Sequence, residues 1–223
     1  MQRTRVKICC IADAQEAAMA VAAGADALGF VGAMPSGPGI VSDEQTRSIV
    51  ATTPPTVSTI ALTSATTASD IAAQLHACAT DTVQVVQHIQ PAEHRKLIEI
   101  MPSIKRLQVI HVEGPAVLEL IEEYEPWVDG FLLDSGRPSL ATTTENVELG
   151  GTGRVHDWTI SAQFVKATKR PVYLAGGLTP TNVGEAIRQV QPFGLDLCSG
   201  IRSNNRLDAT KLQAFVTAVG RCS

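Results

Sequence analysis

The chain has 223 residues, of which 44% are hydrophobic, 18% are charged and only 4% are aromatic, and its formal net charge is -4. This length and apolar content allow a sizeable core, whereas the acidic balance and the few aromatic residues exclude the basic, stacking surface of a general nucleic-acid binder. Gly24 and Asp26 interrupt the longest apolar stretch well short of the roughly 18 residues of a membrane span, and no secretory signal is recognisable, so we expect a cytoplasmic protein.

Short β-rich runs alternate with helical stretches from one end of the chain to the other. The predicted strands are residues 6–9, 27–31, 56–62, 82–86, 106–112, 130–134, 172–175 and 194–198. The predicted helices are residues 13–23, 42–52, 67–78, 91–101, 115–123, 159–168, 179–190 and 208–219. Ser42 is a good N-cap, and Thr179 followed by Pro180 is typical of a helix start. Eight strand-then-helix units predict an α/β fold, a single-domain parallel (β/α)8 TIM barrel over residues 1–223.

A doubly wound open sheet also alternates strands and helices, and it is the competing interpretation. Such a sheet usually carries Gly-x-Gly-x-x-Gly after its first strand, but here the first strand continues into Cys9, Cys10 and Ile11. Glycine-rich turns instead follow the sixth, seventh and eighth predicted strands. Glycines after strands seven and eight match the usual phosphate site of a barrel, so the pattern favours the barrel.

Two predicted strands end in side chains that can move protons. The first ends in Cys9 and the sixth in Asp134. In a parallel barrel both ends lie at one mouth, where a thiol and a carboxyl can act on opposite sides of a small substrate. An isolated cysteine is more often a buried hydrophobe, but a carboxylate at the end of an apolar strand is costly to bury and indicates an opening. Lys7 stands two residues before Cys9 and therefore points to the same side of the strand. Its ammonium group either helps the thiol to ionise or ties neighbouring strands together.

The late glycines predict a phosphate site. Gly176 and Gly177 follow the seventh strand and precede a helix, while Ser199 and Gly200 follow the eighth. Glycines let backbone N–H groups approach an anion closely, and a helix N-terminus adds partial positive charge. The Gly-Gly-Thr-Gly run at 150–153 is either a flexible connector or, as we favour, a loop that closes over the substrate.

The five cysteines are Cys9, Cys10, Cys78, Cys198 and Cys222. Their number is odd, no two form a Cys-x-x-Cys pair, and no histidine stands at zinc spacing. We therefore expect reduced thiols rather than disulfides, and no metal site.

Taken together, these residues resemble the phosphoribosylanthranilate isomerase family of the tryptophan pathway over nearly the whole chain. The shared motifs are Lys-Ile-Cys at 7–9, Ala-Gly-Ala-Asp-x-x-Gly-Phe at 23–30, Leu-Leu-Asp at 132–134, Gly-Gly-Thr-Gly at 150–153 with Asp-Trp at 157–158, Leu-Ala-Gly-Gly-Leu-x-Pro-x-Asn-Val at 174–183 and Asp-x-x-Ser-Gly at 196–200. Six motifs in the right order make this resemblance highly specific.

The resemblance implies an Amadori rearrangement of an N-linked aldose 5-phosphate to a 1-amino-1-deoxyketose phosphate, with no metal and no organic cofactor. By position, Asp134 would be the general acid that protonates the ribose ring oxygen, and Cys9 the general base that removes the proton from C2 of the opened imine. The residues expected to bind the substrate phosphate are Gly176, Gly177, Ser199 and Gly200. Those expected to contact the rest of the substrate are Lys7, Gln84, Arg137, Gly151 and Asp196. We expect a monomer or a homodimer that takes a small-molecule phosphoribosyl substrate.

The chain also departs from the family. After the second strand the family has Ser-Pro-Arg, whose arginine pairs with the anthranilate carboxylate, whereas residues 34–39 contain no cation. Val86 stands where the family has a histidine, Cys10 replaces a glycine, and Arg202 replaces a glutamate. Three interpretations stay open: Arg137 or Arg202 replaces the missing arginine, the chain isomerises another phosphoribosyl amine, or the barrel binds a sugar phosphate without turnover.

Overall fold

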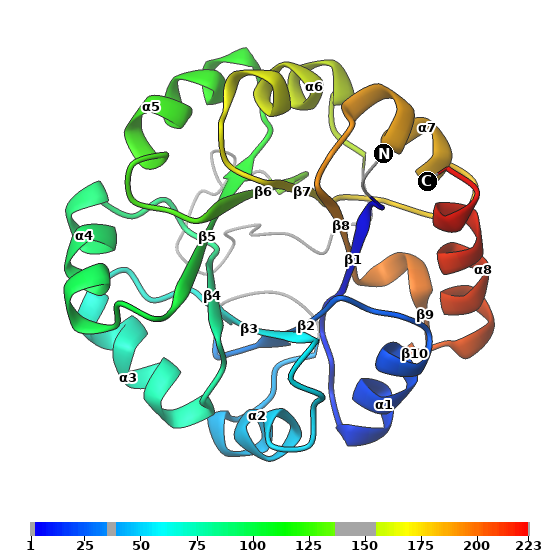
Figure 1. Cartoon of the computed structure of the whole chain (residues 1–223), viewed down its shortest axis with the longest axis horizontal. Helices are drawn as coiled ribbons and strands as arrows, with labels where there is room; N and C mark the ends of the chain where they lie inside the picture. The colour runs from blue at the N-terminus through cyan, green and yellow to red at the C-terminus, as the bar shows by residue number, and fades with distance from the viewer. Residues whose placement is uncertain (1–2, 35–38, 137–154, 223) are drawn as a thin grey trace.

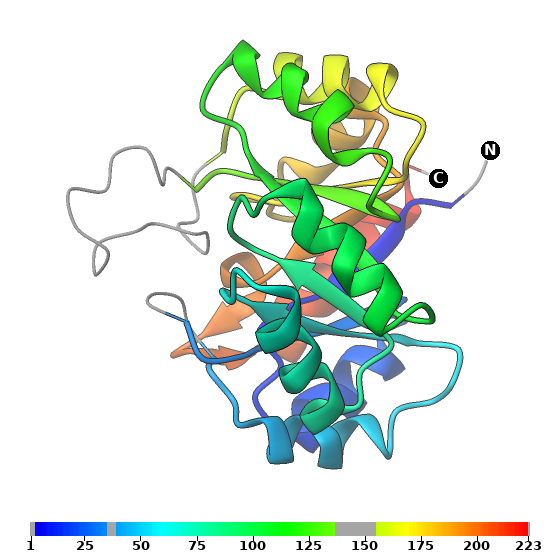
Figure 2. The same cartoon turned by 90° about the vertical axis from the view of Figure 1, so that its left-hand side faces the viewer.

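Eight parallel strands close into a barrel in chain order, with β8 hydrogen-bonded to β1. This computed structural model describes residues 3–34, 39–136 and 155–222. The strands are β1 (Arg5–Ile8), β2 (Ala27–Val31), β3 (Ser58–Thr63), β4 (Thr82–Val85), β5 (Lys105–His111), β6 (Gly130–Asp134), β7 (Val172–Leu174) and β8 (Gly194–Leu197). Figure 1 looks down the ring of strands, and Figures 1 and 2 both show the helices around its outside. The closed ring confirms the predicted (β/α)8 barrel and rules out the open sheet.

The helices follow their strands as predicted. They are α1 (Ala14–Ala22), α2 (Asp43–Val50), α3 (Ala68–Cys78), α4 (Pro91–Ile100), α5 (Leu120–Tyr124), α6 (Trp158–Ala167), α7 (Val183–Val190) and α8 (Ala209–Gly220). Five of them begin after a residue whose side chain accepts a hydrogen bond from a backbone N–H of the first turn: Asp13, Ser42, Thr67, Asp157 and Asp208. Such caps satisfy N–H groups that have no partner within the helix.

Three local features differ from the prediction. The helix expected from residue 179 begins at Val183, because the Asn182 side chain accepts from the Thr179 N–H and donates to the Gly177 carbonyl, which holds the preceding residues in a turn. The helix expected at 115–123 is divided into a 3-10 turn, η1 (Pro115–Glu119), and the short α5. A small antiparallel hairpin, β9 (Arg202–Ser203) with β10 (Arg206–Leu207), was not predicted.

Three aspartates brace the amino-terminal end of the barrel in the same way. Asp26, Asp81 and Asp129 each stand directly before an even-numbered strand, β2, β4 or β6. Each carboxylate accepts the N–H of a residue in the preceding strand, at 2.8 Å from Val6, 2.7 Å from Thr59 and 3.0 Å from Arg106. These bonds tie neighbouring strands at the end opposite the expected site, where the residues of a TIM barrel serve stability.

The apolar core has two main layers. The larger cluster lies between the strands and the surrounding helices and includes Leu28, Phe131, Phe164 and Phe215. A second cluster fills the interior of the barrel and includes Ile60, Leu62, Leu107, Val109 and Leu132, together with Cys9 and Cys10. Among the described residues, no helix has the length and apolarity that crossing a bilayer requires.

Candidate active site

A buried ion pair lies inside the barrel next to Cys9. Lys7 and Asp196 are register partners on β1 and β8, and the Lys7 Nζ atom lies 2.7 Å from an Asp196 carboxylate oxygen. The Lys7 side chain is fully buried, and the Asp196 side chain is 9% exposed. The Lys7 ammonium also acts on the Cys9 thiol and lowers its pKa against the effect of burial. The structure therefore brings together three residues that the sequence predicted, and the contact with Asp196 shows that Lys7 ties β1 to β8.

Gly29 on β2 makes room for this cluster. A Cβ atom at position 29 would lie 2.9 Å from the Cys9 sulfur and 3.0 Å from the Lys7 Nζ atom. Such contacts are too close for any side chain to be accommodated without moving Cys9 or Lys7. The glycine at this strand position is therefore needed for the placement of the thiol and the ammonium group.

Asp134 ends β6 and completes the constellation of titratable groups. One of its carboxylate oxygens accepts the Ser135 N–H at 2.7 Å, and the group interacts electrostatically with both Asp196 and Lys7. Burial raises the pKa of Asp134 to about 6, and the Asp196 carboxylate contributes to the rise, while the Ser135 N–H and Lys7 oppose it. A carboxyl with this pKa holds its proton far more often at neutral pH than an exposed aspartate does, as a general acid requires.

The pKa values of the Cys9 thiol and the Lys7 ammonium group are both raised. Burial raises the pKa of the Cys9 thiol to about 11, against the opposing influence of the Lys7 ammonium. Burial alone would lower the pKa of Lys7, but Asp196 and Cys9 together raise it above its ordinary value. Lys7 is therefore positively charged at neutral pH and favours the ionised form of the neighbouring thiol.

The glycine turns predicted to bind phosphate are in contact with each other. Gly176 and Gly177, just after β7, both have the left-handed backbone conformation that glycine favours, with φ of 83° and 62°. Ser199 and Gly200 belong to a 3-10 turn just after β8. A Cβ atom on Gly200 would lie only 2.2 Å from the carbonyl oxygen of Leu178. The two turns therefore lie side by side at the same end of the barrel.

Gln84 on β4 also faces the interior. Its register partners are Leu62 on β3 and Leu107 on β5, and both leucines belong to the interior cluster. The side chain is buried, and its Oε1 atom has no hydrogen-bond partner among the described residues. Arg137 and Gly151, the other residues predicted to contact the substrate, lie outside the described residues.

Arg202 cannot replace the missing loop arginine as one interpretation proposed. Its side chain is only 7% exposed and forms an ion pair with the Glu16 carboxylate of α1 at 3.1 Å. The same guanidinium donates to the backbone carbonyls of Cys9 and Cys10. The two terminal nitrogens of this buried guanidinium are therefore used within the protein and are not presented to a substrate carboxylate.

The expectation that all thiols are reduced is wrong for two residues. Cys10 and Cys198 form a disulfide although 188 positions separate them, and their Cα atoms are 6.0 Å apart. They come just after the paired ends of β1 and β8, where Ile8 is the register partner of Leu197. Barrel closure makes the first and last strands neighbours, and the spacing of cysteines along the chain cannot reveal such a pair. Cys9, Cys78 and Cys222 are free.

Reducing this disulfide is expected to destabilise the fold. A cross-link over 188 residues restricts the unfolded chain by up to about 5 kcal/mol in the chain-entropy model. At roughly 2–4 °C per kcal/mol for a chain of this size, a dithiol reductant should lower Tm by up to about 10–20 °C. Cys198→Ser should have the lower Tm without reductant, and Cys222→Ser should respond like the wild type. An unchanged wild-type Tm in reductant would contradict the prediction.

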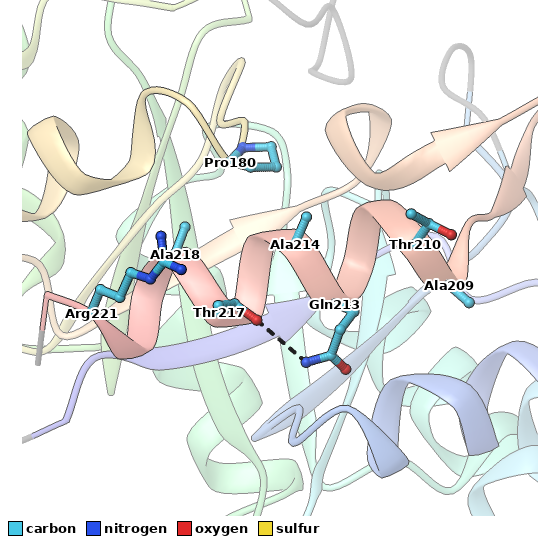
Figure 3. A pocket seen from close by; sticks show the side chains of 8 residues that line it. All are labelled: Pro180, Ala209, Thr210, Gln213, Ala214, Thr217, Ala218 and Arg221. Atoms are coloured by element: carbon cyan, nitrogen blue, oxygen red, sulfur yellow. Dashed lines mark hydrogen bonds between the residues drawn. The ribbon is translucent and has the colours of Figure 1, made fainter.

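One hollow on the outside of the molecule is separate from the site inside the barrel. A shallow hollow lies on the outer side of α8, bordered by Pro180, Gln213, Thr217 and Arg221 (Figure 3), and it includes none of the predicted site residues. No group of three or more potential metal ligands is found in the described part of the chain.

Sequence reasoning missed three contributors to this region. It gave Gly29 no role, although a glycine within an apolar strand is a sign of close approach by other groups. It did not foresee the Glu16–Arg202 ion pair, because only the fold brings α1 and β9 together. It also overlooked His111, which ends β5 as the register partner of Asp134 and has its Nε2 atom 2.9 Å from the Val86 carbonyl.

The family model and the relatives of similar sequence agree on one family. Residues 6–218 match the profile described as N-(5'phosphoribosyl)anthranilate (PRA) isomerase. The chain is 37% identical over 214 residues to N-(5'-phosphoribosyl)anthranilate isomerase 2 of Methanosarcina mazei, an alignment that covers 95% of this chain and 92% of that protein. It is also 37% identical over 215 residues to the isomerase of Pelobacter propionicus, covering 95% and 93% of the two chains.

Solved structures show the same similarity. The phosphoribosyl anthranilate isomerase of Thermus thermophilus has a TM-score of 0.83 and 26% identity, and the match covers 99% of this chain and 100% of that one. A phosphoribosyl anthranilate isomerase in complex with reduced 1-(o-carboxyphenylamino)-1-deoxyribulose 5-phosphate has a TM-score of 0.80 and 26% identity, covering 98% and 99% of the two chains.

Proposed function

The chain belongs to the phosphoribosylanthranilate isomerase family and is an isomerase, and we propose that Asp134 and Cys9 are its general acid and general base. The substrate we propose is N-(5'-phosphoribosyl)anthranilate, and the product is the corresponding 1-amino-1-deoxyketose phosphate of tryptophan biosynthesis. The observation that carries this proposal is the cluster of Lys7, Cys9, Asp134 and Asp196 inside the barrel.

In the first step, Asp134 donates its proton to the ribose ring oxygen. The bond from C1 to the ring oxygen breaks, the ring opens, and the nitrogen lone pair forms the C1–N double bond of a protonated imine, which keeps its N–H proton. The pKa of about 6 supports this role, because at neutral pH the carboxyl is protonated in roughly a tenth of the molecules, against fewer than one in a thousand for an ordinary aspartate.

In the second step, the Cys9 thiolate removes the proton from C2 of the imine. The electron pair of the C–H bond forms the C1–C2 double bond, the electron pair of the C1–N double bond returns to the nitrogen, and the resulting enol-amine tautomerises to the ketose. The Lys7 ammonium, held by Asp196, stabilises the thiolate before the transfer. We assign Asp196 to the sugar hydroxyls as well.

The substrate phosphate binds at the glycine turns after β7 and β8 in this proposal. The residues assigned to it are Gly176, Gly177, Ser199 and Gly200. The contact between the two turns and the positive φ of Gly176 and Gly177 support the assignment, because such turns can direct several N–H groups toward one anion. Gln84, whose Oε1 atom lacks a protein partner, is assigned to the substrate as well.

We propose that the described barrel is a single domain that works in the cytoplasm as a monomer or homodimer. Recognition of the anthranilate carboxylate is where this chain departs from its family. The loop at 34–39 contains no cation, and Arg202 is paired with Glu16, so Arg137 is our candidate for this contact.

The test is turnover of freshly generated phosphoribosylanthranilate by the wild-type chain, followed through the loss of anthranilate fluorescence. We expect steady turnover, and a lower kcat/KM for the phosphoribosyl derivative of aniline, which lacks the carboxylate. Equal kcat/KM values for the two compounds would contradict recognition of the carboxylate. A folded chain that binds ribose phosphates but turns over neither compound would overturn the proposed substrate and leave another phosphoribosyl amine or a non-catalytic binder.

A further inference from the structure

Arg202 lies directly behind the loop that carries Cys9. It is the first residue of β9 and follows the 3-10 turn of Ser199–Ile201. Its Nη2 atom donates to the backbone carbonyl of Cys9 at 3.3 Å and to that of Cys10. Its Nη1 atom donates to the carbonyl of Asn205 at 3.0 Å. One buried guanidinium therefore binds two successive carbonyls of the loop that begins at the proposed base.

Glu16 fixes this guanidinium from the other side. Its carboxylate is 2% exposed and lies 3.1 Å and 3.3 Å from the two terminal nitrogens of Arg202. It also accepts the N–H of Ala12 at 3.1 Å and the N–H of Leu207 at 2.9 Å. Although burial opposes ionisation, these donors and Arg202 hold the pKa of Glu16 below its usual value. The Glu16 carboxylate is therefore ionised at neutral pH, and both it and the two terminal nitrogens of Arg202 have hydrogen-bond partners within the protein, as a buried ion pair requires.

The bonds together fix the segment from Cys9 to Ala12. The N–H of Cys9 donates to the Leu197 carbonyl at 2.7 Å, and the N–H of Ile11 donates to the Gly29 carbonyl at 3.0 Å. Cys10 between them has φ of 63°, a left-handed conformation that is unfavourable for a residue with a side chain. Such a turn persists only where surrounding contacts hold it, and Arg202 binds the carbonyl of Cys10 itself.

We propose that Arg202, held by Glu16, is a positioning residue for the Cys9 thiol. This inference rests on the proposed function, in which Cys9 removes the proton from C2. Arg202 also follows the proposed phosphate turn directly in the chain, so it connects the base to the group that anchors the substrate. A displacement of about 1 Å between a base and its proton can cost on the order of 100-fold in rate.

The test compares Arg202→Met and Arg202→Lys with a matched control, Arg206→Met. Arg206 also pairs with Asp13 and approaches Glu16, but it makes no contact with the carbonyls of Cys9 or Cys10. The assay measures kcat and KM on phosphoribosylanthranilate, with active sites titrated by the reduced product analogue so that unfolded protein does not count.

We expect Arg202→Met to lower kcat per titrated site by about 10- to 100-fold, with KM changed by no more than about 3-fold. Arg206→Met should keep kcat within about 2-fold of the wild type. Arg202→Lys keeps the positive charge but loses the guanidinium group that binds the carbonyls of Cys9 and Cys10. Its Tm should therefore stay near the wild-type value while its kcat is reduced. If Arg202→Met fails to fold, the kcat of Arg202→Lys tests the positioning role in its place.

Wild-type kcat in either folded Arg202 variant would overturn the positioning role, as would an equal loss in Arg206→Met. Cys9→Ser separates this failure from failure of the proposed function. If Cys9→Ser is as active as the wild type, then the assignment of the base is wrong. If Cys9→Ser is inactive while both Arg202 variants are fully active, only the positioning role is wrong.

Discussion

Asp134→Asn is expected to lower kcat by about 100- to 10,000-fold and to make the folded chain more stable at neutral pH. The loss of activity follows from the removal of the only proposed proton donor for the ribose ring oxygen, and general acids typically contribute rate factors of this size. Asparagine has nearly the same shape, so KM and the binding of the product analogue should change little.

The gain in stability follows from the direction of the pKa shift. The folded-state pKa of Asp134 is about 6, above its ordinary value of 3.8, so the folded state holds this proton more tightly than the unfolded state does. That contribution to stability is fully present below about pH 4 and is lost as the pH rises through about 6. Above pH 7 the ionised carboxylate costs roughly 3 kcal/mol, which the neutral asparagine removes.

Asp129→Asn is the matched control at the opposite end of the same strand. Its carboxylate pairs with Arg106 and accepts the Arg106 N–H, so this variant should lose stability and keep the wild-type kcat. Denaturant unfolding at pH 5 and pH 8, together with kcat for both variants, is the measurement. A less stable Asp134→Asn at pH 8, or one with more than a tenth of the wild-type kcat, would contradict the expectation.

Local sequence signals were sufficient to predict the barrel. The strands β2 and β6 have the predicted bounds, because a run of apolar residues ends at a polar or glycine-containing loop on each side. The start of α7 was misplaced, because Thr179 and Pro180 look like a helix start, whereas the side chain of Asn182 prolongs the turn by four residues. Such a competition between caps depends on side-chain geometry that a propensity cannot weigh.

The sequence likewise predicted some residues of the proposed site but not their partners. Cys9 and Asp134 were recognisable because strand ends in a barrel share one mouth, and Lys7 was placed correctly by strand alternation. Lys7 pairs with Asp196 on β8, and Cys10 pairs with Cys198 just after β8. Local pattern could not predict either pair, because its two members lie almost 190 positions apart. These pairings depend on the register with which the last strand closes against the first.

Cys9→Ser is expected to lower kcat by about 100- to 10,000-fold while leaving the proposed phosphate site intact. The thiol, with a pKa of about 11 beside Lys7, still yields a minor thiolate, whereas a serine hydroxyl in the same place is far less acidic. Binding of the reduced product analogue should stay within about 3-fold of the wild type, because the sulfur is not assigned to phosphate binding. Cys78→Ser, the same change at a buried cysteine on α3 outside the barrel, should keep the wild-type kcat.

The pH profile of the wild type tests the same assignment without a substitution. The productive form holds one proton, on Asp134, and has an ionised Cys9; the more abundant form holds its single proton on Cys9 instead. Because both forms carry the same number of protons, kcat/KM should be level between the two pKa values, about 6 and about 11, and should fall below pH 6 with a slope of about one. Asp134→Asn removes the group that titrates near 6, so its residual activity should lose the level region and rise with pH toward the pKa of Cys9, about 11. A wild-type kcat/KM that keeps rising from pH 7 to pH 9 would contradict the exchange of one proton between the two groups.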